Sequence, residues 1–120
     1  MRVLAAWELL SCQVECVITV NNEESPEDMA DLIEYCFALQ GPWARLRASD
    51  GRLEPYRSFT LELGNEQPLA ELIAQVRRLA SAMGRRAREL RLTLPRIVVG
   101  QNLQGPLGPL TRRMRLGAAA

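Results

Sequence analysis

The chain has 120 residues, 48% of them apolar, which is the size and composition of one small folded domain. Its net charge of +1 gives no electrostatic case for nucleic acid or a membrane as a partner. It contains no histidine, which excludes a Ser-His-Asp or Cys-His catalytic pair and a zinc site with histidine ligands.

The first predicted elements are a strand and a capped helix. Residues 14–20 are rich in β-branched side chains and almost continuously apolar, which is typical of a strand buried on both faces of a parallel sheet. Ser25-Pro26-Glu27-Asp28 predicts a helix start, with a capping serine, a proline in the first turn and two acids at the positive end of the dipole. A stripe of apolar residues at helical spacing, Met29, Leu32, Ile33 and Cys36, follows. We expect this helix to end between residues 35 and 38.

The pattern between Gly41 and Arg57 is irregular and contains an Asp50-Gly51 turn. A stretch of this length without secondary structure is usually functional or disordered. Residues 59–63 predict a short second strand. A second helix is predicted from Leu69 to about residue 90, with an end or kink at Gly84, and residues 97–99 predict a third strand.

This order of elements predicts an α/β fold with about three parallel strands and two helices, joined by right-handed crossovers. We expect this unit to occupy residues 14–100, after an N-terminal lead-in over residues 1–13. Residues 101–120, which are rich in arginine and alanine, are expected to form a disordered tail.

The cysteines and the N-terminus indicate a soluble protein. Three cysteines are too few for a disulfide framework, and Cys12 and Cys16 lack a second pair of metal ligands. Cys36 is expected to be a buried free thiol. No apolar run is long enough to span a membrane, and Trp7-Glu8 interrupts any signal-peptide core, so we expect no membrane partner. A reducing compartment, and so the cytoplasm, is favoured.

Polar clusters follow the first two predicted strands, where function collects in parallel α/β folds. Asn21 begins the first cluster, which a solvated loop before the helix also explains. Asn65 and Glu66 form the second, directly after Gly64, which allows a sharp turn. Burial of Glu66 against the sheet would raise its pKa toward the range that a general acid needs. An ordinary polar loop is the alternative.

Three blocks of the sequence, in order, resemble the α-L-arabinofuranosidases of glycoside hydrolase family 51. They are an acidic helix ending in Glu34-Tyr35-Cys36, a linker from Trp43 to Tyr56 of the form Trp-x-x-Leu-Arg-Ala-x-x-Gly-x-x-Glu-Pro-Tyr, and a strand ending in Gly64-Asn65-Glu66. The resemblance covers roughly residues 14–100. It implies that the chain is a fragment of a (β/α)8 TIM barrel in which residues 14–20 form the third strand.

The resemblance also implies roles for individual residues. Glu66 would be the catalytic acid/base at the end of the fourth barrel strand, and Asn65 would bind the sugar 2-hydroxyl. The linker would lie near the substrate rim, with Trp43 and Tyr56 as candidate walls, although packing of a long loop explains these two equally well. Together with Asn21, these are the expected substrate-binding residues. No cofactor and no metal are implied.

The catalytic nucleophile is missing. A retaining glycosidase needs a second carboxyl group about 5–5.5 Å from the first. The acids after Glu66 are Glu71 and Glu89, and both fall in the predicted second helix. Glu62 precedes Glu66 by four residues of strand, roughly 13 Å. A full barrel also needs about 200 residues or more. We therefore expect a truncated gene model, a degenerate copy or one piece of a longer polypeptide.

The leading hypothesis is thus a fragment of a retaining α-L-arabinofuranosidase, inactive alone, whose partner is an arabinose-containing oligo- or polysaccharide. The alternative is a non-catalytic carbohydrate-binding or interaction module. A third hypothesis is that the arginine-rich end, from Arg85 to Arg115, contacts nucleic acid. We expect no such partner, because this end lacks interleaved aromatic residues and any nucleic-acid-binding motif.

Overall fold

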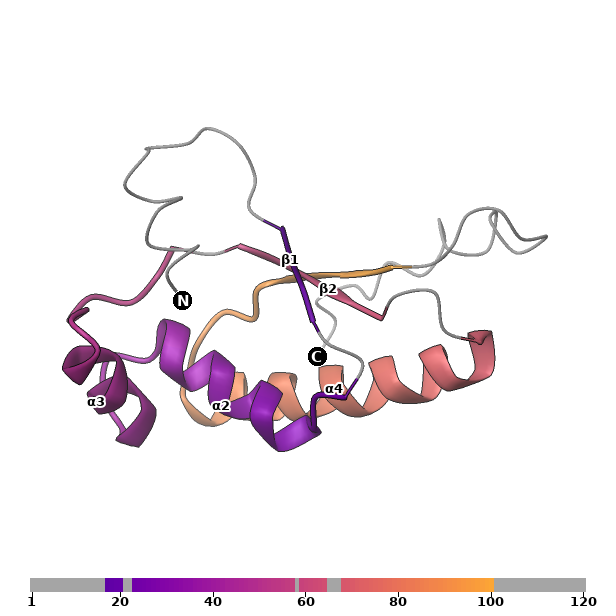
Figure 1. The fold of residues 1–120 in the computed structure, drawn as a ribbon. Helices are drawn as coiled ribbons and strands as arrows, with labels where there is room; N and C mark the ends of the chain where they lie inside the picture. Colours follow the sequence, from indigo (N-terminus) through magenta and orange to yellow (C-terminus); the bar gives the residue numbers. More distant parts are fainter. Residues whose placement is uncertain (1–16, 21–22, 58, 65–67, 101–120) are drawn as a thin grey trace.

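The described part of the chain is an α/β domain with three parallel strands and three helices in an open sheet. The computed structural model describes residues 17–20, 23–57, 59–64 and 68–100. The strands are β1 (Val17–Thr19), β2 (Thr60–Leu63) and β3 (Arg96–Val99), and the helices are α2 (Pro26–Phe37), α3 (Pro42–Ser49) and α4 (Leu69–Glu89) (Figure 1). The predicted fold class and the predicted parallel strands are confirmed. The predicted lead-in over residues 1–13 and the tail over residues 101–120 lie outside the described residues.

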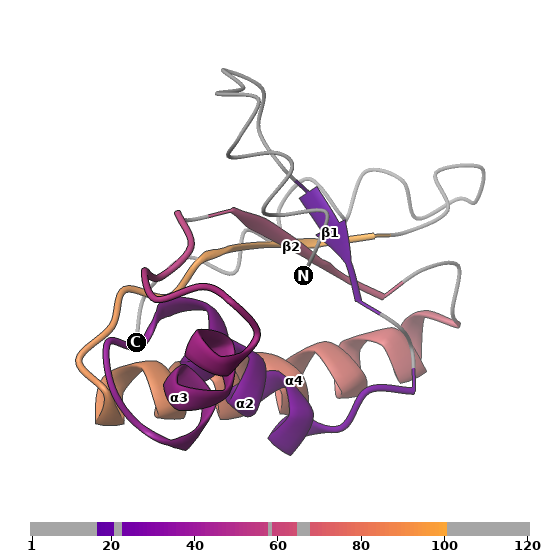
Figure 2. The same ribbon diagram turned by 60° about the vertical axis from the view of Figure 1, so that its left-hand side comes forward.

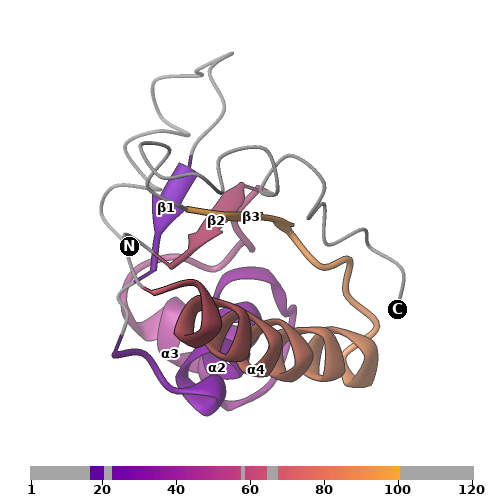
Figure 3. The same ribbon diagram turned by 90° about the vertical axis from the view of Figure 1, so that its right-hand side faces the viewer.

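The strands follow one another in the sheet in the order β1-β2-β3, and both neighbouring pairs are parallel. Leu61 at the centre of β2 is in register with Ile18 of β1 and Ile97 of β3. All three described helices lie on the same side of the sheet (Figures 1 and 3). The connection from β1 to β2 and the connection from β2 to β3 run in the same direction across the sheet and pass over the same face. The two crossovers therefore have the same hand.

The core lies between β2 and the two long helices. Leu61 and Leu63 alternate with polar residues on β2, and both are completely buried against the helices. The inward faces of α2 and α4 supply six further large buried side chains of this cluster, Met29, Ile33, Leu72, Val76, Leu79 and Met83. A helix at 3.6 residues per turn and a strand with period two thus present matching apolar surfaces, as the sequence pattern predicts.

Strand β1 differs from its prediction. Val17 is 51% exposed and Thr19 is also exposed, while Ile18 between them packs against the core. Burial of the strand on both faces is therefore wrong for Val17–Thr19. The reason is topological: the described helices cover one face of the sheet, so only every second side chain of β1 reaches the core.

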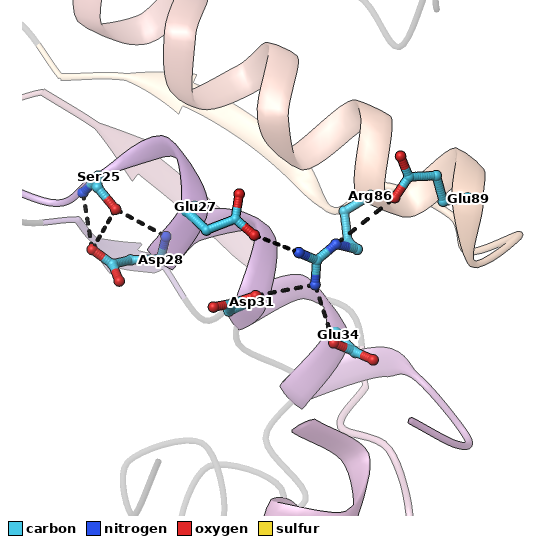
Figure 4. Close-up of polar contacts among 7 residues, drawn as sticks. All are labelled: Ser25, Glu27, Asp28, Asp31, Glu34, Arg86 and Glu89. Atoms are coloured by element: carbon cyan, nitrogen blue, oxygen red, sulfur yellow. Dashed lines mark hydrogen bonds and ion pairs between the residues drawn. The ribbon is translucent and has the colours of Figure 1, made fainter. Parts of the chain in front are cut away.

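Helix α2 begins and ends as predicted. The Ser25 hydroxyl accepts a bond from the Asp28 N–H at 3.1 Å, and the Asp28 carboxylate accepts from the Ser25 N–H at 3.2 Å and from its hydroxyl at 2.5 Å (Figure 4). This is a capping box. The hydrogen bonds from Ser25 favour the charged carboxylate and lower the pKa of Asp28. At its other end α2 stops at Phe37.

Two features of the helices were not predicted. Pro42–Ser49, within the stretch expected to be irregular, forms helix α3, which lies beside the end of α2 (Figure 2). Helix α4 is continuous from Leu69 to Glu89, so Gly84 neither ends it nor starts a second segment. A glycine in the middle of a helix costs about 1 kcal/mol. This cost is smaller than the free energy that α4 gains by burying its whole apolar face.

Candidate functional site

The carboxyl ends of the three strands are held side by side by backbone hydrogen bonds. The Val20 N–H donates to the Glu62 carbonyl at 2.9 Å, and the Gly100 N–H donates to the Leu63 carbonyl at 3.0 Å. Gly64 directly follows β2, is buried, and has a φ of 79°. This left-handed conformation favours glycine, and it turns the chain at the end of the central strand as the sequence predicts.

The three residues predicted to act at this end, Asn21, Asn65 and Glu66, lie outside the described residues. The segments that carry them are nevertheless anchored close together. Val20 and Gly64 immediately precede them, and Val20 is bonded to β2 one residue before Leu63. The polar clusters after β1 and β2 therefore start from neighbouring points at one edge of the sheet.

A pair of polar side chains lies on the helix-free face at this edge. The Thr19 hydroxyl donates a 2.6 Å hydrogen bond to Oε2 of Glu62, its partner in the β1–β2 register. The other carboxylate oxygen faces Gly100, where a Cβ atom would come within 2.7 Å of it and would collide with the Gly64 carbonyl oxygen. Sequence reasoning missed this pair, because it depends on a register that no local pattern reveals.

The two acids that follow Glu66 in the sequence both belong to helix α4. Glu71 lies in the first turn of α4 and Glu89 is its last residue, and both are exposed. The prediction that neither ends a strand is confirmed. Glu89 lies 3.9 Å from Arg86, one turn away on the outside of the domain.

Trp43 and Tyr56 lie at the opposite end of the sheet. The linker that contains them runs from the end of α2 to the start of β2, and α3 lies on the side where β2 begins (Figure 1). The prediction that these residues wall a site at the carboxyl rim is therefore wrong. A helix-to-strand connection in a parallel α/β unit reaches the amino end of the next strand, and the functional rim is at the other end.

Tyr56 has a structural role at that amino end. Its side chain belongs to the buried core, and its N–H donates to the Cys36 carbonyl at 2.8 Å. The Arg52 guanidinium lies 3.9 Å from the centre of its ring, the distance of a cation–π contact. The Tyr35 hydroxyl donates to Asp50 at 2.7 Å. These contacts join the linker to the last turn of α2.

Arg47 is the centre of the linker, and sequence reasoning gave it no role. It is 1% exposed, and its guanidinium donates to the carbonyl oxygens of Tyr35 and Ala38 at 2.8 Å and of Leu53 at 3.0 Å. Two of these carbonyls lie at the C-terminal end of α2, where a cation is favourable. Only the spacing within the linker motif could have indicated that this arginine points inward.

Arg86 joins α4 to α2 through three carboxylates of α2 and also lies near a fourth, Glu89, on its own helix (Figure 4). It lies 2.8 Å from Glu27, 3.1 Å from Asp31, 3.1 Å from Glu34 and 3.9 Å from Glu89. Only Glu34 among the four is nearly buried, at 8% exposure of its side chain. Three acids of α2 thus take part in a contact between α2 and α4.

Cys36 is not a nucleophile. It is completely buried in the core, and this burial raises its pKa to about 12. The predicted buried free thiol is confirmed. We expect Cys36 to escape alkylation by iodoacetamide in the native protein at pH 8 and to react fully in 6 M guanidinium, as mass spectrometry of the Cys36 peptide would show. Rapid alkylation of the native protein would contradict this result.

The described residues offer no metal centre and no membrane span. No group of three or more acidic or cysteine side chains among them could hold a metal ion. None of their helices is both long and apolar enough to cross a bilayer. No protein-family model matches the chain, and no curated protein sequence matches it.

Proposed function

We propose that this chain is part of an α-L-arabinofuranosidase-like retaining glycosidase and carries the acid/base half of the active site, with Glu66 as the proton donor. The observation that carries the proposal is the conformation of Gly64. The central strand of a parallel sheet ends there in a buried left-handed turn, and the next two residues are Asn65 and Glu66. Residues in this position of parallel α/β enzymes perform catalysis.

The order of the strands supports a barrel segment as the larger context. In a doubly wound sheet the strand order reverses and helices cover both faces. Here consecutive strands are neighbours, and the described helices share one face. A (β/α)8 barrel repeats this arrangement, with its helix-free face turned toward the barrel axis. Thr19 and Glu62 would then point inward, and α2 and α4 would belong to the outer ring.

The proposed chemistry requires a second carboxylate. Glu66 would protonate the glycosidic oxygen, and a nucleophile about 5–5.5 Å away would form the covalent intermediate. Within the described residues that follow β2, Glu71 and Glu89 are both helical and exposed. The 120-residue chain is therefore expected to bind an arabinofuranosyl ligand and not to hydrolyse it.

A binding and turnover experiment tests the proposal. An α-1,5-linked arabinotriose, followed by amide NMR shifts, is expected to perturb Val20, Gly64 and Gly100 at the carboxyl edge. Glu66→Ala should weaken this binding about tenfold, the value of one good polar contact to the ligand. With 4-nitrophenyl α-L-arabinofuranoside we expect no release of nitrophenol.

Glu54→Gln is the matched control, because it removes one exposed carboxylate at the opposite end of the sheet; binding should be unchanged. Perturbed amides confined to the α3 linker, or an absence of binding, would contradict the proposal. Turnover that disappears in Glu66→Gln would show that a nucleophile is present after all. Binding that is insensitive to Glu66 would favour a non-catalytic carbohydrate-binding module.

A further inference from the structure

The outward face of α4 carries four exposed arginines. Arg77, Arg78, Arg85 and Arg88 are all exposed, whereas the opposite side of the helix is buried in the core. At 100° per residue these four side chains fall within an arc of about 100°, in two rows. Along the helix axis, Arg77 and Arg88 are about 16 Å apart, and Arg78 and Arg85 are about 10 Å apart.

These four arginines differ from Arg86, which lies between them in sequence. Arg86 faces α2 and is surrounded by carboxylates. Among the residues that the structure describes, none of the other four has an ion-pair partner. The helix therefore separates one inward, neutralised arginine from an outward row of positive charge, which we call the α4 arginine face (Arg77, Arg78, Arg85 and Arg88).

The chemistry and the spacing indicate a linear polyanion. Guanidinium groups bind carboxylates and phosphates through two parallel hydrogen bonds. The four charges are spread over about 16 Å of a rigid helix, which is longer than a single anionic group. This spacing suits a chain in which anionic groups repeat. The remaining exposed residues of this face, such as Ala74 and Ser81, are small. They offer no aromatic ring on which a neutral sugar or a base could stack.

A polymer of carboxylates fits better than nucleic acid. The whole chain has a net charge of only +1, and the acidic helix α2 packs beside α4. A molecule with this balance of charges would repel a densely charged phosphate backbone more than it repels a polymer with fewer charges per unit length. Helix α4 also starts at Leu69, five residues after Gly64, so its face leads away from the candidate site at the carboxyl edge.

We propose that the α4 arginine face binds an acidic polysaccharide, a polyuronate that carries the arabinose side groups. This inference rests on the proposed function. The arginines hold the acidic main chain on the outside of the domain while an arabinose branch reaches the carboxyl edge. The substrate class is then an arabinose-substituted acidic polysaccharide and not a neutral one.

Titration of the full chain with an oligogalacturonate of about ten residues tests the proposal. We expect binding at low salt that weakens as salt is added. The fully methyl-esterified oligomer, which keeps the sugar chain and loses the charges, should not bind. Arg77→Gln with Arg88→Gln should weaken binding about tenfold, since each exposed ion pair contributes a factor of a few. Arg45→Gln with Arg57→Gln, which removes one exposed charge from α3 and one from the segment between α3 and β2, is the matched control.

We expect the α4 variant to bind oligogalacturonate more weakly and the control variant to bind it as the unmodified chain does. Equal loss in both variants, binding of the methyl ester, or tighter binding of a DNA duplex than of the oligogalacturonate would each overturn the proposal. Arabinotriose binding separates the two proposals. If the chain binds oligogalacturonate but not arabinotriose, the proposed function is wrong. If the chain binds arabinotriose but not oligogalacturonate, only the proposed role of the α4 arginine face is wrong.

Discussion

Arg47→Ala is expected to lower the free energy of unfolding by about 3–4 kcal/mol, or to prevent folding. The substitution deletes three hydrogen bonds and leaves the carbonyl groups of Tyr35, Ala38 and Leu53 without their donor. Each buried carbonyl that loses its partner costs about 1–3 kcal/mol, and water can reach some of these groups once the side chain is gone. The end of α2, the linker and the start of β2 would then separate.

Urea denaturation followed by circular dichroism measures this effect, and Arg45→Ala is the matched control. Arg45 lies on the same helix and is exposed, so its loss should change stability by no more than about 0.5 kcal/mol. Arg47→Lys should recover part of the loss, because an ammonium group reaches one or two of the carbonyls but lacks the planar geometry for all three. If Arg47→Ala were as stable as Arg45→Ala, the linker would not depend on this contact.

The elements with strong local signals could be predicted from the sequence. Ser25 and Asp28 form the expected cap, and the apolar stripe that begins at Met29 faces the core. The same holds for α4, whose apolar residues recur over 21 residues. In each case a local propensity and a burial pattern agree, so short-range information is sufficient.

Helix α3 could not be predicted because its local signals conflict. Its eight residues contain one large aliphatic side chain, Leu46, and that side chain is 43% exposed, while the buried residues are Ala44 and Arg47. A periodicity argument takes an arginine as an exposed residue. The helix is instead stabilised by tertiary contacts to α2, which exist only once α2 and the linker have come together.

The candidate site was predictable in part. Gly64 was identified as a turn residue, and its positive φ agrees. The family resemblance predicts Trp43 and Tyr56 at the carboxyl rim, but the linker that contains them connects a helix to the next strand and therefore lies at the amino end of the sheet. The Thr19–Glu62 pair depends on strand register, and register is a long-range property.

Leu61→Ala is expected to lower the free energy of unfolding by about 3 kcal/mol, within the 2–5 kcal/mol range of large-to-small core changes. Leu61 is completely buried at the centre of β2, the strand that pairs with both neighbours. Its loss leaves a cavity under the middle of the sheet, which α2 and α4 cannot fill without losing their own contacts. The same chemical change at Leu53, which is 78% exposed, should cost less than about 0.5 kcal/mol.

The comparison of these two leucine variants also tests whether the described unit is a cooperative domain. If residues 17–100 unfold as one unit, Leu61→Ala should shift two urea midpoints equally: the one measured by circular dichroism, and the one measured by Trp43 fluorescence in a chain whose other tryptophan, Trp7, is replaced by phenylalanine. Trp43 lies in α3, away from the sheet, so it reports on the linker. A shift confined to one probe would mean that the linker and the sheet unfold separately.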